Sequence, residues 1–229
     1  MFFGAGMEHV DEPYFAHIPR WTTTRRIWQF FSPETRRLLG AWDPYRAYRD
    51  WLPCATGRWS PLARDQYAEA HTLLPGYLLS SQGDRMAMAN SVEGRFPYLD
   101  HRVIEFANRL PPRYKLRALT EKYILKKAVQ GLLPETIRRR VKQPYRAPDS
   151  QSFFRAGRPV DDVAELLSAE RLRDAGYFDP PAVAKLVAKC RDGRAAGFGD
   201  NMAFVGILST MLLDELFVRR RTRAEAALV

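Results

Sequence analysis

Apolar positions recur at helical spacing along most of the chain, and prolines interrupt them often. The prolines predict short helical pieces from 13 to 60, a stretch that is rich in aromatic residues and arginine. Ser32 followed by Pro33 is typical of a helix that begins with a polar cap and a proline. A longer helix is predicted from Ser60 to about Leu74, and Pro75-Gly76 separates it from a second apolar segment that includes Met86 and Met88.

The middle of the chain carries further helix patterns. Asp100 is placed to cap a helix whose apolar stripe is expected to face inward, formed by Val103, Ile104, Phe106, Ala107 and Leu110. Thr120 is predicted to cap the next helix, which Gly131 would stop in a left-handed conformation. The segment from Pro134 to about Val141 is predicted as a short basic helix.

After position 141 the pattern changes. The run KQPYRAPDS, 142 to 150, predicts a proline-interrupted polar loop. Helices are predicted at about 160 to 172 and 180 to 191, followed by a glycine-rich hinge from 193 to 199 and a final apolar helix from about 201 to 219. Because there is no internal repeat and almost no strand-like alternation, the sequence predicts a predominantly α fold.

Composition is typical of a globular protein and leaves an anionic partner open. The 36 Lys and Arg residues exceed the 26 Asp and Glu residues, which is compatible with a nucleotide, pyrophosphate, nucleic acid or acidic protein partner, or with an ordinary solvated surface. The two distant cysteines fit neither a zinc site nor a disulfide framework. No apolar run approaches the roughly 18 residues of a membrane span, and no signal-peptide pattern is found, so we expect a cytoplasmic location.

Charged residues between 84 and 100 form the first candidate site. Asp84, Arg85, Glu93 and Arg95 alternate there with Met, Phe and Tyr, so we expect their charges to be partly desolvated. A carboxylate in such surroundings is a candidate for acid–base work. A structural Glu93–Arg95 ion pair, with Asp100 only a cap, explains the same residues.

Lys142 is the second candidate. It follows three arginines and a valine and precedes two prolines, which would hold its ammonium group in a fixed place. A fixed lysine is suited to stabilising negative charge that develops on a phosphoryl or carbonyl oxygen in a transition state. An ordinary surface charge is the alternative.

Motifs in a fixed order carry a resemblance to a known family. They are GDRMAMA from Gly83, SVEGRFPYLDHR from Ser91, LPP from Leu110, KYIL from Lys122, GLLP from Gly131 and RRRVKQPYRAP from Arg138. In order and spacing they are similar to the glutamine-dependent asparagine synthetases, densely from 75 to 150 and more loosely from 1 to 74 and from 151 to 217. The resemblance implies a mostly α chain that forms the helical C-terminal half of an α/β adenine-nucleotide-hydrolase-like synthetase domain of the ATP-pyrophosphatase type.

The resemblance also implies a domain position and a chemistry. Residues 1–60 would be a helical lead-in within the synthetase domain, and residues 61–229 its C-terminal part. In the family, a glutaminase domain releases ammonia, and the synthetase domain uses ATP and Mg²⁺ to convert aspartate into β-aspartyl-AMP, from which ammonia displaces AMP.

Three residues match functional positions of the family, and Arg95 lies beside one of them. Glu93 matches the glutamate that takes a proton from the attacking ammonia or organises the neighbouring charges. Lys142 matches the mobile-loop lysine that stabilises the adenylation transition state, and Lys122 a lysine near the ATP phosphates. Arg95 would contact or orient the substrate, while Asp84 and Arg85 would give structural support.

The sequence departs from the family in the nucleotide site. It contains no SGGxDS pyrophosphate loop and no Gly-Ala-Asp-Glu turn with a magnesium-binding aspartate, and no cysteine follows Met1. We therefore expect most of the ATP and Mg²⁺ site to lie outside this chain, with a separately encoded N-terminal glutaminase and phosphate-loop half as a partner or with truncation as the cause.

Two consequences follow from these departures. The chain alone is expected to be inactive, because charged groups without positioned phosphates supply little catalysis. Helices near 62 to 90 and 120 to 130 would show apolar surface, so the isolated chain should be poorly soluble or associate.

Two other functions stay open. A related adenylate-forming enzyme would close a lactam, cyclise a peptide or amidate another carboxylate in a secondary-metabolite pathway, since Glu93 and Lys142 do not distinguish between acceptors. A non-enzymatic basic helical module would bind nucleic acid or an acidic protein with a steep salt dependence. The sequence has no nucleic-acid recognition motif, and we expect neither nucleic acid nor a membrane as a partner.

Overall fold

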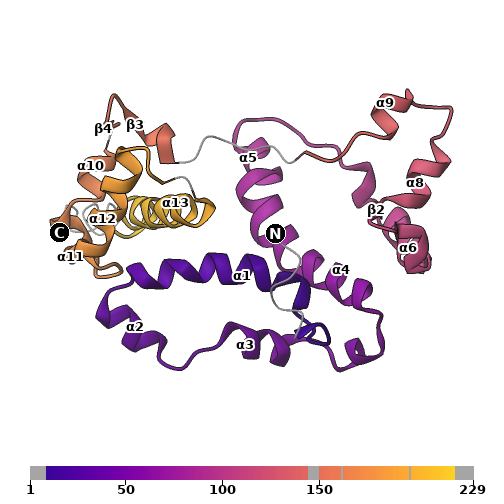
Figure 1. Ribbon diagram of the computed structural model, residues 1–229, viewed down its shortest axis with the longest axis horizontal. Coiled ribbons are helices and arrows are strands. Elements are labelled where there is room, and N and C mark those ends of the chain that lie inside the picture. The colour runs from indigo at the N-terminus through magenta and orange to yellow at the C-terminus, as the bar shows by residue number, and fades with distance from the viewer. Residues whose placement is uncertain (1–8, 144–149, 161, 196, 220–229) are drawn as a thin grey trace. The chain divides into compact units, whose positions relative to one another are not determined.

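The computed structural model describes residues 9–143, 150–160, 162–195 and 197–219 (Figure 1). The chain divides into two compact units, which we call unit 1 and unit 2. Unit 1 comprises Met1–Val10, Phe15–Ala47 and Tyr145–Val229, and unit 2 comprises Asp11–Tyr14 and Tyr48–Pro144. Both are built almost entirely of helices, which confirms the predicted α fold. The predicted boundary at residue 60 refers to the family's domain and stays a prediction.

Unit 1 joins the N-terminal helices to the C-terminal ones. Its elements are η2 (Phe15–His17), α1 (Ile18–Arg25), η3 (Arg26–Phe30), α2 (Pro33–Leu39), the start of α3 (Pro44–Trp51), η7 (Ser150–Phe153), β3 (Phe154–Arg155), β4 (Arg158–Pro159), α10 (Val163–Leu166), α11 (Ala169–Ala175), α12 (Pro180–Arg191), α13 (Phe198–Leu213) and the π-helix η8 (Asp214–Arg219).

Polar caps begin several helices of unit 1. Ser32 Oγ accepts a hydrogen bond from the backbone N–H of Thr35 at 3.0 Å, with Pro33 at the start of α2, as the sequence predicts. Ser168 caps α11 in the same way, and Gly176 ends α11 with a φ of 76°. The predicted single helix from 160 to 172 is therefore wrong, because Ser168 starts a new helix after α10 has ended.

A short backbone ladder ties the N-terminal segment of unit 1 to its C-terminal helices. The Ser32 N–H donates to the carbonyl of Tyr177 at 3.0 Å, and the Asp179 N–H donates to the carbonyl of Phe30 at 2.8 Å. Ser32 Oγ also donates to the carbonyl of Gly176 at 2.7 Å. Residues almost 150 positions apart thus form one unit.

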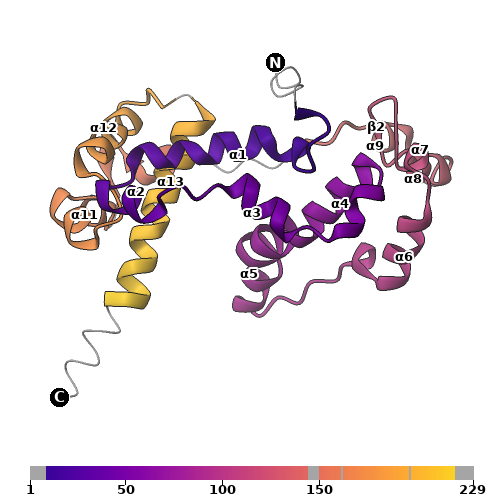
Figure 2. The same cartoon turned by 90° about the horizontal axis from the view of Figure 1, so that it is seen from below.

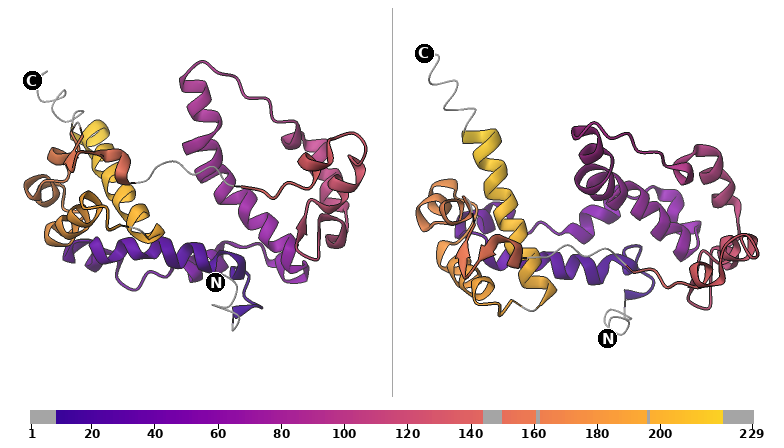
Figure 3. Two further views of the ribbon diagram at one scale, coloured as in Figure 1. Left: turned by 45° about the horizontal axis from the view of Figure 1, so that its top comes forward. Right: turned by 90° about the horizontal axis from the view of Figure 1, so that it is seen from above.

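The core of unit 1 surrounds α13. This helix contacts α12, η3 and α1, and its crossing of α1 can be followed in Figures 2 and 3. The buried core side chains come from η3 and from the segment 163–211, and they are Phe30, Val163, Leu166, Leu167, Leu172, Phe178, Val183, Leu186, Cys190, Ala195, Ala203, Phe204, Ile207, Leu208 and Met211.

Helix α13 and η8 together form a long apolar segment. Among the described residues, Phe198–Arg219 is a helix of 22 residues that is long and apolar enough to cross a membrane by length and composition alone. The sequence predicts one apolar helix from about 201 to 219, but polar residues such as Ser209, Thr210 and Asp214 interrupt the segment, so it contains no uninterrupted apolar run of that length. In the structure, one face of α13 is buried in the core of unit 1.

Unit 2 contains the middle of the chain. Its elements are the end of α3, η4 (Cys54–Arg58), α4 (Pro61–His71), the π-helix η5 (Leu74–Gln82), α5 (Asp84–Ala89), η6 (Pro97–Leu99), α6 (His101–Arg109), α7 (Pro112–Lys115), β1 (Leu116–Arg117), β2 (Thr120–Glu121), α8 (Tyr123–Ala128) and α9 (Glu135–Arg138).

Unit 2 buries few side chains among its described residues. Its buried positions are Tyr14, Tyr48, Thr56 and Ala68. An aromatic cluster joins α3 to α4, with the Tyr67 ring stacked on His71 at 3.9 Å and near Trp51 and Trp59. Outside that cluster, large apolar side chains of η5, α5 and α8 are exposed, as predicted for 62 to 90 and 120 to 130, namely Tyr77, Leu78, Met86, Met88, Ile124 and Leu125.

Helix α6 shows how a correct local prediction can fail in tertiary structure. Asp100 caps it as predicted, accepting from the Arg102 N–H at 2.9 Å. The stripe expected to face inward does not, because Val103, Ile104 and Phe106 are 41%, 40% and 65% exposed. The helix is amphipathic, but the described elements of unit 2 leave these three side chains exposed.

The segment before α8 also differs from the prediction. Thr120 does not cap α8, because it pairs with Arg117 in the antiparallel hairpin of β1 and β2. The chain instead enters α8 through Lys122, which has a left-handed φ of 55° and no side-chain cap. Gly131 has a positive φ of 84°, but it is not the residue that stops α8, because α8 ends at Ala128 with Val129 as its C-cap. Helix α9 is shorter than the predicted basic helix. Residues 144–149 of the predicted 142–150 loop lie outside the described residues.

Candidate functional site

A pocket in unit 2 collects residues from the hairpin, α8, α9 and the segment after α9. Its volume is about 860 Å³. It is lined by Leu116, Leu119, Thr120, Glu121, Tyr123, Lys126, Lys127, Arg138, Arg139, Val141 and Lys142. The sequence region that contains two of the predicted site lysines therefore folds around one concave surface.

The hairpin turns the chain at one edge of this pocket. Strands β1 and β2 are joined by Ala118 and Leu119, which both have positive φ angles, of 46° and 61°. Two successive left-handed residues suit the right-handed twist of a two-residue hairpin, although glycine or asparagine is usual there. Arg117 donates from Nη1 to the hydroxyl of Tyr123 at 3.1 Å and so ties the hairpin to α8.

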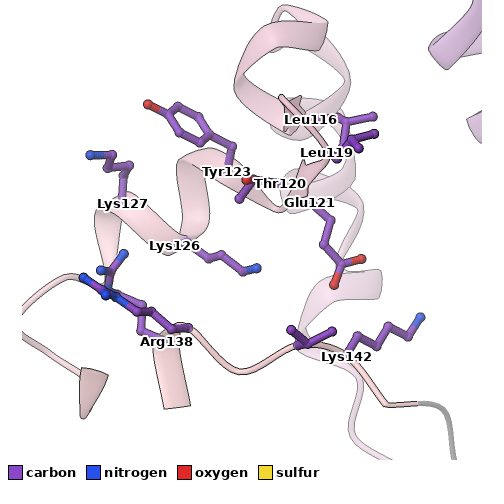
Figure 4. A pocket seen from close by; sticks show the side chains of 11 residues that line it. Leu116, Leu119, Thr120, Glu121, Tyr123, Lys126, Lys127, Arg138 and Lys142 are labelled. Atoms are coloured by element: carbon purple, nitrogen blue, oxygen red, sulfur yellow. The ribbon is translucent and has the colours of Figure 1, made fainter. Parts of the chain in front are cut away.

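The pocket carries a marked excess of positive charge. Five of its lining residues are lysine or arginine, and Glu121 is its one carboxylate. Figure 4 shows the side chains of Lys126 and Glu121 directed toward the same space, with Lys142 on the segment that borders it. Such a surface attracts an anion, because the surrounding cations supply both charge and hydrogen-bond donors.

A three-residue ion cluster lies at the α9 side of the pocket. Glu135 accepts from Arg138 Nε at 2.6 Å and from Arg138 Nη2 at 2.5 Å, and it also accepts from Arg139 Nε. These bonds, those from Arg138 first, lower the pKa of Glu135 from 4.5 to about 2. The carboxylate is therefore ionised at any physiological pH, and it holds two guanidinium groups together.

The two lysines predicted for the site, Lys142 and Lys122, differ in their relation to the pocket. Lys142 is exposed and lines the pocket. Lys122 is exposed at the start of α8, between two lining residues, Glu121 and Tyr123, and is not itself part of the lining. The prolines expected to fix Lys142 lie outside the described residues. The roles implied for both lysines stay predictions.

Glu93 lies in the segment between α5 and η6. Its carboxylate accepts from Arg95 Nη2 at 3.0 Å, and the two side chains are 68% and 82% exposed. The expected partial desolvation of this pair is therefore wrong for the described structure, in which both side chains are largely exposed. The pair does not line the pocket that contains Lys142. Asp84 begins α5, half-buried, and the supporting role predicted for it and Arg85 stays a prediction.

Several pocket residues were missed by sequence reasoning. Glu121, Lys126, Lys127, Arg138 and Arg139 line the pocket, yet only the arginines had been noted, as part of a charged run. The sequence contained one signal for Lys126, since it lies one helical turn after Lys122 and is therefore expected on the same side of the helix. The part played by Glu121 depends on the hairpin, which the sequence did not reveal.

The fold and the pocket define a helical protein with a cationic surface suited to a polyanion. The family model of asparagine synthase matches residues 5–214, and the chain belongs to that family.

Individual relatives match a smaller part of the chain. The amidase chyE of Penicillium rubens is 34% identical over 140 residues, which is 58% of this chain and 20% of that protein. A putative asparagine synthetase of Mycobacterium tuberculosis is 37% identical over 136 residues, or 59% of this chain and 20% of that protein. The glutamine-hydrolysing asparagine synthetase 1 of Bacillus subtilis is 34% identical over 116 residues, or 49% and 18%.

The chain thus spans about a fifth of the length of the relatives it matches. No solved structure matches it.

Proposed function

We propose that this chain forms part of an enzyme that makes an amide from a carboxylate, ATP and ammonia, with aspartate as the carboxylate. The observation that carries the proposal is the pocket in which Lys142 and four further cations surround one carboxylate, in a chain of the asparagine synthase family. The family membership supplies the reaction class, and the pocket supplies charge of the sign that the reaction needs.

The first proposed step is adenylation. A carboxylate oxygen of aspartate attacks the α-phosphorus of ATP, the bond from that phosphorus to the bridging oxygen of the β-phosphate breaks, and pyrophosphate leaves. Negative charge builds up on the phosphoryl oxygens and on the leaving group. Lys142 would stabilise this charge, because a lysine ammonium is a compact point charge suited to phosphoryl oxygens.

The second proposed step is displacement. The ammonia nitrogen attacks the acyl carbon, the bond from that carbon to the AMP oxygen breaks, and the nitrogen must lose a proton. Glu93 would accept that proton, and Arg95, which donates to it at 3.0 Å, would hold its carboxylate in place. Both side chains are exposed in the described structure, so the proposal requires the rest of the domain to cover them.

The described residues fit the two cofactors differently. The five pocket cations fit the phosphates of ATP. The described residues contain no group of three or more His, Cys, Asp or Glu that could hold a metal ion. The described residues therefore do not fit Mg²⁺. We derive no step through the metal and propose that residues outside this chain bind it.

Partner and location follow from the same proposal. A polypeptide that carries the SGGxDS loop would complete the nucleotide site, and a glutaminase would supply ammonia. The 229-residue chain alone would not catalyse amide formation. The proposed location is the cytoplasm, as the sequence predicts.

The test is amide formation with and without the missing part. The chain alone, and the chain combined with the polypeptide encoded immediately upstream of Met1, would be incubated with ATP, Mg²⁺, aspartate and ammonia. We expect pyrophosphate and asparagine only from the combination, and loss of both in Lys142→Ala but not in Lys185→Ala, an exposed lysine of α12 in unit 1. Turnover by the chain alone, or equal effects of the two variants, would contradict the proposal.

A second candidate function has support from the comparisons. Two relatives named amidases match 58% and 53% of this chain, which is consistent with a substrate other than aspartate. The same assay with a panel of carboxylates distinguishes the two functions, because asparagine formation requires aspartate. Neighbouring genes of a peptide or polyketide pathway would also favour this alternative.

A further inference from the structure

The guanidinium groups of Arg138 and Arg139 retain unused donors at the pocket. A guanidinium has five N–H donors, and Glu135 engages Nε and Nη2 of Arg138 but only Nε of Arg139. Within the described residues, Nη1 of Arg138 and both terminal nitrogens of Arg139 make no hydrogen bond. Both residues line the pocket, and the side chain of Arg138 is only 16% exposed.

The ion cluster fixes these groups without cancelling their charge. Glu135 carries one negative charge, because its pKa is about 2, and the two arginines carry two positive charges. A bidentate contact such as that of Arg138 restricts the guanidinium plane. The cluster therefore presents a net positive charge, with the guanidinium of Arg138 held in one plane, at the pocket that Lys126, Lys127 and Lys142 also line.

The pocket suits an anion with more than one phosphate. Its cations come from three segments, with Lys126 and Lys127 on α8, Arg138 and Arg139 at the end of α9, and Lys142 after it. A diphosphate group carries more charge and more acceptor oxygens than an inorganic phosphate or a carboxylate, and the volume of about 860 Å³ leaves room for it.

We infer that Arg138 and Arg139 bind a diphosphate group in the Lys142 pocket, and that Glu135 is the residue that positions them. The diphosphate belongs either to pyrophosphate or to the terminal phosphates of a nucleoside triphosphate. The inference rests on the proposed function for its place in a reaction, but the binding itself requires no turnover.

The test is calorimetric titration of the 229-residue chain with pyrophosphate at fixed low salt. Arg138→Gln/Arg139→Gln should weaken binding about tenfold or more, because two charge-assisted contacts are lost. The matched control is Arg191→Gln/Arg194→Gln, which removes two exposed arginines that likewise share one carboxylate, that of Asp192, in unit 1. Both double variants change the net charge equally, so equal effects, or no effect of the first, would overturn the inference.

Glu135→Gln separates positioning from simple electrostatics. If Glu135 acted only as a nearby negative charge, its removal would strengthen pyrophosphate binding. If it positions the arginines, binding weakens despite the gain in positive charge, by about threefold or more. Unchanged or tighter binding would overturn its positioning role. Arg138→Lys/Arg139→Lys, which keeps the charge but loses the fork geometry, should also bind more weakly than the unaltered chain, and circular dichroism checks that each variant is folded.

Ligand arms identify the group that is bound. Pyrophosphate and ATP should both bind, and AMP and inorganic phosphate should bind at least tenfold more weakly; AMP binding as tight as that of ATP would overturn the diphosphate assignment. Loss of pyrophosphate binding in the Gln pair, together with no amide formation by the assembled protein, would leave this inference standing and refute the proposed function. Unchanged pyrophosphate affinity in Arg138→Gln/Arg139→Gln, together with amide formation by the assembled protein, would refute this inference and leave the proposed function standing.

Discussion

Isoleucines at two helical positions offer a direct comparison of the two units. Ile207 in α13 is 1% exposed in the core of unit 1, whereas Ile104 in α6 of unit 2 is 40% exposed. Substituting alanine removes the same three carbons at each position. The difference in cost therefore measures how completely each unit covers its apolar side chains.

The expected magnitudes follow from burial. Ile207→Ala should cost about 2 to 5 kcal/mol, since transfer and cavity effects both apply in a close-packed core. At the partly exposed Ile104, substitution by alanine loses only part of the transfer free energy of roughly 0.8 kcal/mol per carbon. It leaves no enclosed cavity, and the higher helix propensity of alanine offsets some of the loss. Its cost should be about 1 kcal/mol or less.

Hydrogen exchange under increasing urea measures both costs in the intact chain. Peptides from α13 and α6 report the opening free energies of their own units, which overall unfolding does not separate. Similar losses for the two variants, or a larger loss for Ile104→Ala, would show that α6 is packed against other parts of the chain and would refute the burial assigned here.

Further predictions concern single sites. Burial, followed by the negative charge of Asp65, raises the pKa of Tyr48 from 10.0 to about 12. The folded state therefore favours the neutral phenol, and the contribution of this preference to folding stability is complete below pH 10 and is lost as the pH rises through 12. In an ultraviolet titration Tyr48→Phe should remove one late-ionising tyrosine, and an unchanged titration would contradict the assignment. Ser168→Ala removes the cap of α11 and should cost about 1 kcal/mol in the thermal unfolding of unit 1, whereas no shift would mean that α11 does not depend on this cap. Leu119→Gly relieves a left-handed φ of 61° and should stabilise the hairpin by up to about 1 kcal/mol, measured by exchange of the 116–121 amides; a loss of protection would contradict it. Replacing the exposed Phe106 by Ser should reduce self-association in sedimentation experiments. If the variant associates as strongly as the unaltered chain, the apolar surface responsible for self-association lies elsewhere.

Local signals predicted much of the secondary structure. Ser32-Pro33, Ser60-Pro61 and Asp100 begin helices in the structure as the sequence indicates, because a cap and its backbone partner lie within three residues. Pro75 and Gly76 were expected to separate two helical segments, yet both lie within the π-helix η5. A proline in the first turn of a helix loses no hydrogen bond, so it marks a start as readily as a break.

Tertiary features were less accessible to sequence reasoning. The apolar stripe of α6 predicted a buried face, but periodicity specifies which residues share a face and not whether another element covers it. Thr120 had the residue type of a cap, and its pairing with Arg117 depends on the left-handed turn at Ala118 and Leu119, where no glycine or asparagine signals it. The pocket escaped prediction for the same reason, since Glu121 lines it only because the hairpin turns there.

The most direct measurement of the central claim is exchange of labelled pyrophosphate into ATP, which reports the adenylation step alone. It would be carried out with the assembled protein, containing this chain and the polypeptide that supplies the SGGxDS loop. We predict exchange that depends on aspartate, that Lys142→Ala abolishes, and that Glu93→Gln retains while losing asparagine formation. Exchange that is equally active in Lys142→Ala would contradict the role of the Lys142 pocket in adenylation.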